Sequence, residues 1–130
     1  MSVLQTLNID FEAADKRGSL VQLVHSGYTQ VNVLRTRKGQ ERGGHYHEGS
    51  NEVFYVIDGM VTVNAFSNTE RETKTYRKGD FFLIPAGTVH SMYFPEDTVM
   101  VGMYDVPVEK EDGSKDIIPY FYEAGNEQTR

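Results

Sequence analysis

The sequence predicts an all-β protein in which many short antiparallel strands form a sandwich or a barrel. Short runs of alternating or continuous apolar residues recur along the chain, and turn-forming residues separate them roughly every ten positions. No segment of ten or more residues has the apolar periodicity of an amphipathic helix, so the sequence predicts no helix. The length of 130 residues suits one domain that buries enough surface to fold without disulfides.

Each expected strand has a pattern that suits one or two buried faces. Two runs alternate between polar and apolar side chains, so one face of each can pack on a core. The others are short and rich in β-branched or aromatic side chains, which favours strands. Asp58-Gly59 between two runs predicts a tight hairpin. The expected strands are residues 30–35, 53–57, 60–66, 81–84 and 99–104.

The C-terminal part of the chain changes character. We assign residues 1–106 to a barrel with its N-terminal strands, and residues 107–130 to a loop and edge segment of the same domain. Within this segment, 109–116 reads as a polar loop. The apolar stretch 117–122 could cover a sheet edge or join a dimer interface, and 123–130 is expected to be a frayed tail.

Composition excludes several classes of protein. The absence of cysteine excludes a disulfide framework, a thiolate metal site and a cysteine nucleophile. Thirteen Lys and Arg against nineteen Asp and Glu give a formal charge of −6, which disfavours binding to the nucleic-acid phosphate backbone. Since neither a signal peptide nor a long apolar span is evident, we expect a cytoplasmic protein without a membrane partner.

Three of the four histidines form a candidate metal site together with one glutamate. His45 and His47 stand at i and i+2, so both point to one face of a strand. Glu52 follows at the start of the next strand, and His90 follows a later turn. Three imidazoles and a carboxylate are common ligands of divalent first-row metals. The alternatives are polar residues on an exposed strand face, or a hydrogen-bonded cluster without metal.

The residues around these four positions fit two longer motifs. Residues 39–59 read G-x5-H-x-H-x4-E-x6-G, and the segment from residue 79 reads G-x5-P-x-G-x2-H. In this order the motifs closely resemble the cupin family, whose fold is a small antiparallel β-barrel of the jelly-roll type, also called a double-stranded β-helix. The second motif extends over 79–94, where Phe94 replaces the usual asparagine, a position that does not bind metal.

The resemblance implies a ligand set and a cofactor. It assigns a divalent transition metal, with zinc, iron, manganese and nickel left open, to His45, His47, Glu52 and His90. His25 is the one histidine without an assigned role.

Two short segments resemble cupins that act on nucleotide-linked keto-sugars, the deoxysugar epimerases and 3,4-ketoisomerases. Asp15-Lys16-Arg17-Gly18 is similar to their D-x-R-G segment, and Arg42-Gly43-Gly44-His45 is similar to their R-G-x-H segment. The resemblance implies that Arg17 and Arg42 contact the nucleotide diphosphate, a role that suits a guanidinium because it can hold phosphate oxygens bidentately.

The resemblance predicts an enzyme of carbohydrate metabolism that epimerises or ketoisomerises its substrate through a metal-stabilised enolate. The candidate catalytic residues are His45, His47 and Tyr104. A simple histidine base is in conflict with the full ligand set, because a ligating imidazole has no free lone pair. Tyr55, Tyr93 and Glu48 are weaker candidates for the base.

Two other functions fit the same ligands. An iron-dependent dioxygenase could use three histidines and a glutamate, and a non-enzymatic cupin could bind a metal or a small ligand. Small cupins of this type usually form homodimers, often by exchanging N-terminal strands. Residues 20–24 and 117–122 are the expected interface segments.

Overall fold

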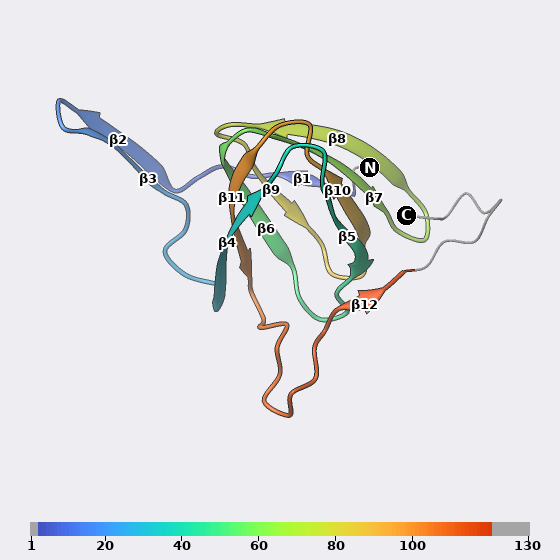
Figure 1. Ribbon diagram of the computed structural model, residues 1–130. Coiled ribbons are helices and arrows are strands. Elements are labelled where there is room, and N and C mark those ends of the chain that lie inside the picture. Colours follow the sequence, from blue (N-terminus) through green and yellow to red (C-terminus); the bar gives the residue numbers. More distant parts are fainter. Residues whose placement is uncertain (1–2, 121–130) are drawn as a thin grey trace.

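The computed structural model describes residues 3–120 and confirms the predicted all-β fold (Figure 1). Two five-stranded antiparallel sheets pack against each other, and a separate two-stranded hairpin projects from them. The part of the chain that the structure describes contains no helix, and so no helix that could cross a membrane. The expected frayed tail, residues 123–130, lies outside the described residues.

Every run that was expected to be a strand is one. The first sheet has the order β1 (Gln5–Thr6), β9 (Phe81–Ile84), β6 (Glu52–Asp58), β11 (Thr98–Tyr104) and β4 (Gln30–Thr36). The second has the order β12 (Ile118–Pro119), β5 (Glu41–Tyr46), β10 (Val89–Tyr93), β7 (Met60–Phe66) and β8 (Arg71–Arg77). The hairpin pairs β2 (Phe11–Asp15) with β3 (Gly18–Gln22).

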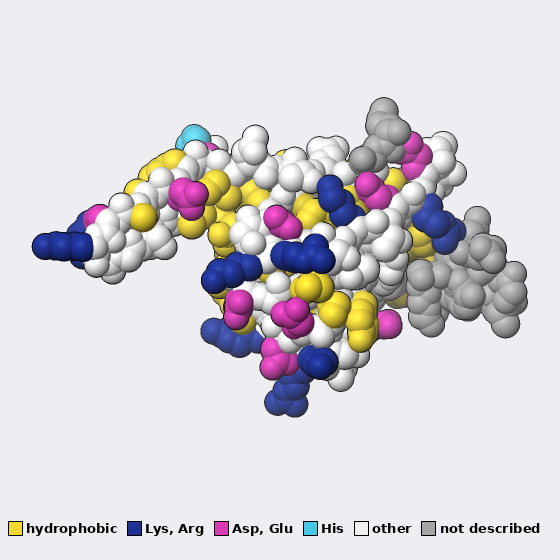
Figure 2. All heavy atoms as spheres, turned by 90° about the horizontal axis from the view of Figure 1, so that it is seen from above, with side chains coloured by type: hydrophobic (Ala, Val, Ile, Leu, Met, Phe, Trp, Pro, Cys, Tyr) yellow, Lys and Arg dark blue, Asp and Glu magenta, His cyan; other side chains and the backbone are white. Residues whose placement is uncertain are grey.

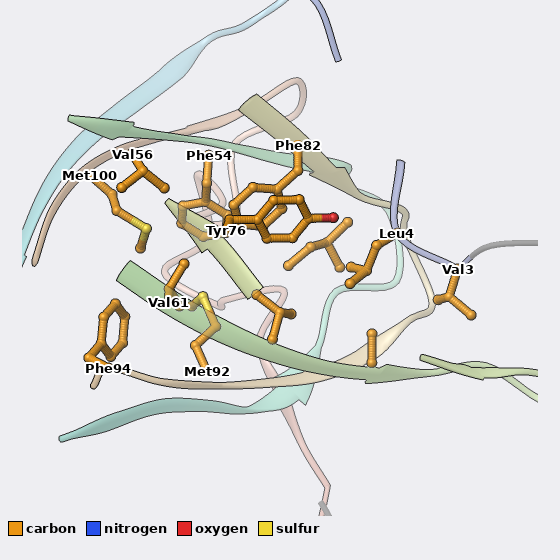
Figure 3. Packing of buried hydrophobic residues seen from close by; sticks show 13 residues of the cluster. Val3, Leu4, Phe54, Val56, Val61, Tyr76, Phe82, Met92, Phe94 and Met100 are labelled. Atoms are coloured by element: carbon orange, nitrogen blue, oxygen red, sulfur yellow. The ribbon is translucent and has the colours of Figure 1, made fainter. Parts of the chain in front are cut away.

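An apolar core fills the space between the two sheets (Figure 3). Its centre is a stack of Tyr76 from β8 on Phe82 from β9, with ring centroids 3.9 Å apart and planes 4° from parallel. Phe54 of β6 packs beside Phe82 at 5.5 Å. Buried aromatic rings contribute large apolar areas, so this cluster holds the two sheets together.

A second apolar cluster lies on the outer side of the first sheet. Val53, Phe81 and Met103 are buried there, although they alternate with residues of the inner core. The chain segments before and after the hairpin cover them, through side chains that include Leu7, Ile9, Leu23, Val24 and Tyr28. Both faces of β6 are therefore buried, as the continuous apolar run 53–57 indicates.

The hairpin predicted at Asp58-Gly59 is wrong, because β6 and β7 belong to different sheets and the turn between them joins the two sheets. This turn needs a glycine for two reasons. Gly59 has φ of 99°, in the region that side chains of L-residues rarely adopt. A Cβ at this position would also lie 2.5 Å from the carbonyl oxygen of Asp97 and against the hydroxyl of Thr98. The Thr98 hydroxyl in turn donates to the carbonyl of Met60 at 2.9 Å, so it cannot move away freely.

We predict that Gly59→Ala destabilises the protein more than Gly79→Ala. Gly79 has φ of 90° but open space around it, so its substitution costs only the backbone strain, about 1–2 kcal/mol. At Gly59 the added methyl group also meets backbone, which adds about 1–3 kcal/mol. Urea unfolding of the two variants measures the difference, and equal free energies of unfolding would contradict this account.

Candidate metal centre

Strand pairing brings three imidazoles together inside the barrel. In the register of β5 and β10, His90 lies opposite His45, and His47 follows directly after the end of β5. The ring centroid of His45 lies 4.9 Å from that of His47 and 4.8 Å from that of His90. One ligand nitrogen from each of the three residues lies within 4.8 Å of the others, close enough to share one metal ion.

Glu52 lies beside this cluster at the start of β6. One of its carboxylate oxygens, Oε1, is 3.3 Å from His47 Nε2 and 3.5 Å from His90 Nε2. The side chain is buried, and a buried carboxylate needs a compensating partner. The fold therefore places all four predicted ligands together, whereas the sequence alone showed only their spacing along the chain.

Two carbonyl groups fix the orientation of the buried imidazoles. His47 Nδ1 donates to the carbonyl of Asp116 at 2.6 Å, and His90 Nδ1 donates to the carbonyl of Thr88 at 3.1 Å. Because a carbonyl can only accept, each ring carries its proton on Nδ1 and turns Nε2 toward the centre. His90 Nε2 is buried there without any hydrogen-bond partner, as expected of a ligand atom that faces a metal. The donor set of three nitrogens and one oxygen fits a divalent transition metal.

The surroundings keep two of the rings neutral. Burial, together with the neighbouring His90 and His47, lowers the pKa of His45 to about 4. Burial also lowers the pKa of His90. Burial acts in the same direction on His47, but its hydrogen bonds to Glu52 and to the Asp116 carbonyl raise its pKa overall. At neutral pH, His45 and His90 therefore present lone pairs without a proton to displace.

Tyr104 is the candidate catalytic residue that lies at this centre without being one of the four proposed ligands. Its ring packs edge-on to that of His47, with centroids 5.2 Å apart. Burial raises its pKa far above the ordinary value, and the nearby charge of Glu52 and a hydrogen bond to it act in the same direction. Tyr104 therefore stays protonated at neutral pH and suits a proton donor better than a base.

The weaker candidates lie elsewhere. Tyr55 packs against Phe81 in the outer cluster, and Tyr93 and Glu48 are exposed.

Two aspartates that the sequence analysis did not single out hold the loop between His47 and Glu52. Asp105 accepts from the backbone and side-chain amides of Asn51, both at 2.8 Å. Asp116 accepts from the amides of Glu48 and Gly49 at 2.8 and 2.9 Å. Neither aspartate belongs to a local motif, and their partners are 54 to 68 positions away in sequence.

Arg42 is an exposed residue on the same strand as His45, three positions closer to the start of β5. It pairs with the buried Met92, and residues directly opposite in an antiparallel pair share a face. A bulge between His90 and Ser91 lets Arg42 and His45 lie on the same face of β5 in spite of their odd spacing. The Arg42 guanidinium donates to the Thr36 hydroxyl at 2.7 Å, which links β5 to β4.

Arg17 lies far from this cluster within one chain. It occupies the tip of the β2–β3 hairpin, where it forms an ion pair with Asp15 at 2.6 Å and is 84% exposed. The hairpin extends away from the barrel, with basic side chains at its far end (Figures 1 and 2). The structure thus brings Arg42, but not Arg17, to the barrel that holds the histidines.

Residues 32–107 match the family of cupin domains, a range that contains the four candidate ligands. The chain belongs to the cupin family. A curated relative of this cupin is quercetin 2,3-dioxygenase of Bacillus subtilis strain 168, at 37% identity over 67 residues. The match covers 51% of this chain but only 19% of that protein.

Solved structures of two 3,4-ketoisomerases and of a capsular polysaccharide assembling protein share the fold. WlaRB, a TDP-quinovose 3,4-ketoisomerase of Campylobacter jejuni, superposes with a TM-score of 0.76 at 17% identity, over 91% of this cupin and 93% of that chain. A mutant of the 3,4-ketoisomerase QdtA of Thermoanaerobacterium thermosaccharolyticum, in complex with TDP-4-keto-6-deoxyglucose, gives 0.71 at 16% identity, over 87% and 86%. CapF of Staphylococcus aureus, a capsular polysaccharide assembling protein, gives 0.60 at 23% identity, over 85% of this cupin and 32% of that chain.

We predict that the cupin binds one divalent metal ion per chain and that His45→Ala and Glu52→Gln weaken this binding by at least about 100-fold. Even residues that only orient metal ligands contribute about 10–100-fold, so a ligand contributes more. Calorimetric titration with zinc or nickel measures the affinity.

The matched control is His25→Ala. His25 is exposed, and its Nδ1 donates to the carboxylate of Asp10 at 2.6 Å, away from the cluster. Metal affinity should be unchanged in this variant. Wild-type affinity in either ligand variant would argue that the histidines form a polar cluster without metal.

Proposed function

We propose that this cupin is a cytoplasmic, metal-dependent isomerase or epimerase that acts on a nucleotide-linked keto-sugar. The observation that carries the metal part is the buried His90 Nε2, which has no hydrogen-bond partner and faces His45, His47 and Glu52. The sugar part is supported by Arg42, which lies on the same strand and the same face as His45. It is also supported by the fold that the cupin shares with WlaRB, a TDP-quinovose 3,4-ketoisomerase, and with QdtA, a 3,4-ketoisomerase in complex with TDP-4-keto-6-deoxyglucose.

The four ligands define what the site can do. A divalent metal held by them would polarise a keto oxygen of the substrate and stabilise the enolate that forms when the adjacent carbon loses a proton. His45, His47 and His90 would act as ligands only, since the ring lone pair of each would be bound to the metal. Tyr104, protonated and next to Glu52, would hold or donate a proton at its hydroxyl. The Glu52 carboxylate would take up the proton that leaves the carbon, and Tyr104 would give its hydroxyl proton to the other face of the same carbon or to the neighbouring carbon. The hydrogen bond between Tyr104 and Glu52 would then return the proton from Glu52 to Tyr104.

Arg42 is the proposed phosphate contact. Its Nε donates to Thr36 and its Nη2 to the carbonyl of Arg35 at 3.2 Å, so the guanidinium is oriented by neutral acceptors. Among the residues that the structure describes, no carboxylate forms an ion pair with Arg42. The remaining N–H groups could therefore bind a diphosphate without displacing an acidic partner.

We predict that the metal-loaded cupin, incubated with TDP-4-keto-6-deoxyglucose in D₂O, incorporates deuterium at the carbon next to the keto group. Proton NMR measures the exchange. Arg42→Ala should lower kcat/KM by roughly 10–100-fold, because a charge-assisted hydrogen bond contributes about 1.5–3 kcal/mol.

Arg77→Ala, at the end of β8, is the matched control and should leave the rate unchanged. Absence of exchange, together with no thermal stabilisation by TDP or UDP, would overturn the sugar-nucleotide function.

An iron-dependent dioxygenase is the second candidate, because the curated relative quercetin 2,3-dioxygenase is 37% identical over the matched residues. Oxygen consumption by the Fe(II)-loaded cupin with a flavonol, in the absence of deuterium exchange with keto-sugars, would favour this function. Binding of a small ligand without either reaction would indicate a non-enzymatic cupin.

We also propose that the cupin forms a homodimer through its N-terminal hairpin. Phe11 and Leu20 on the hairpin are 50% and 55% exposed, and Val31 and Val33 on the edge strand β4 are 61% and 57% exposed. A second copy would cover such apolar surface, and it would offer Arg17 a site in the partner. Residues 117–120 of the other expected interface segment pair with β5 or lie beside it, and 121–122 lie outside the described residues.

We predict that light scattering gives twice the chain mass, and that Leu20→Asp shifts the protein toward monomer because a charge on the hairpin opposes burial. The exposed Glu109→Gln is a control that should stay dimeric. A monomeric wild-type protein would refute the dimer.

A further inference from the structure

We infer that Asp116 is a positioning residue for the metal ligand His47. The C-terminal loop from residue 107 to 120, which carries Asp116, therefore helps to orient a ligand of the metal centre. This inference rests on the proposed metal site, but not on the proposed substrate.

Asp116 contacts His47 and the two residues that follow it. Its backbone carbonyl accepts from His47 Nδ1 at 2.6 Å, while its carboxylate accepts from the amide of Glu48 through Oδ1 at 2.8 Å and from the amide of Gly49 through Oδ2 at 2.9 Å. Asp116 is 8% exposed and His47 is 3% exposed, so the bond to the ring is shielded from water, while the two bonds of the carboxylate are partly buried. One residue thus binds both the ring of the ligand and the backbone that carries it.

The loop that carries Asp116 is itself fixed on both sides. Before it, the Asp116 amide donates to the carbonyl of Val108 at 2.7 Å, and an antiparallel bridge joins Glu109 to Lys115. After it, β12 pairs with β5, with Pro119 opposite His45. The Asp116 carbonyl that accepts the hydrogen bond from His47 therefore has little freedom to move. Its position depends on β5, the strand that carries the ligand His45.

The carboxylate explains why an aspartate is needed here. Any residue would offer a backbone carbonyl to His47, but only a side chain with two acceptors can bind the amides of Glu48 and Gly49 together. An asparagine would keep one acceptor and direct an NH₂ group at the other amide. The loop after His47 would then lose a bond, and the ring would lose its fixed direction toward His90 and Glu52.

Asp116→Asn and Asp116→Ala test the inference, with Asp112→Ala as the matched control. Asp112 lies in the same loop and also accepts from backbone, at 2.9 Å from the Ser114 amide, but it is exposed and contacts no ligand. We expect zinc affinity, measured by calorimetry, to fall about 10–100-fold in the Asp116 variants and to stay unchanged in Asp112→Ala.

A second readout separates positioning from stability. In the metal-free protein at pH 8, ¹⁵N NMR should show the His47 ring protonated on Nδ1, and the Asp116 variants should populate the Nε2-protonated form. Zinc affinity within twofold of wild type in the near-isosteric Asp116→Asn, with the tautomer unchanged, would overturn the inference and leave the proposed function intact. Metal binding that depends on Asp116, in a protein that does not turn over keto-sugars, would support the inference and refute only the proposed reaction.

Discussion

The metal centre depends on one close approach between two strands. β5 and β10 meet where Gly43 lies against the backbone of His90, and a Cβ on Gly43 would be only 2.7 Å from the His90 carbonyl oxygen. Gly43 also has φ of 99°, so the position excludes side chains by conformation as well as by contact. This approach allows the bulge that sets His90 opposite His45. A slip of one residue in this register would turn the imidazoles to opposite faces.

The same pairing determines which groups surround the imidazoles. β5 has β10 on one edge and β12 on the other, so the C-terminal loop that contains Asp116 reaches the centre through β5 itself. The apolar core around Tyr76 and Phe82 fills the space between the two sheets (Figure 3), and His47 and His90 are buried with it. In this low-dielectric surrounding, each carbonyl that binds an Nδ1 proton fixes a ring more firmly than it would at the surface.

The sequence predicted the parts that follow from local pattern. Alternation and turn residues were enough for the strands, and i, i+2 spacing was enough to place two histidines on one face. The cupin motifs added Glu52 and His90, which lie on other strands. Asp105 and Asp116 could not be predicted, since a loop aspartate has no periodicity and its partners are fixed only by the folded chain. The position of Arg17 could not be predicted either, because a turn motif does not determine whether its hairpin packs on the barrel or projects from it.

The net charge of −6 conflicts with an anionic substrate only if charge acts over the whole surface. Salt screens exposed charges beyond roughly 10 Å, so the charged groups close to a bound anion decide the electrostatic potential that it meets. A surface pocket at the other end of the barrel from the metal centre, where β4 and β6 end and β11 begins, is lined by Arg35 and Arg37 and by two carboxylates, Asp58 and Asp97. Arg42 adds a third guanidinium through its bond to the Arg35 carbonyl. For a phosphate held by Arg42, the guanidinium in direct contact therefore outweighs acidic residues that lie beyond the screening distance, and the net charge of the chain does not decide whether the anion binds.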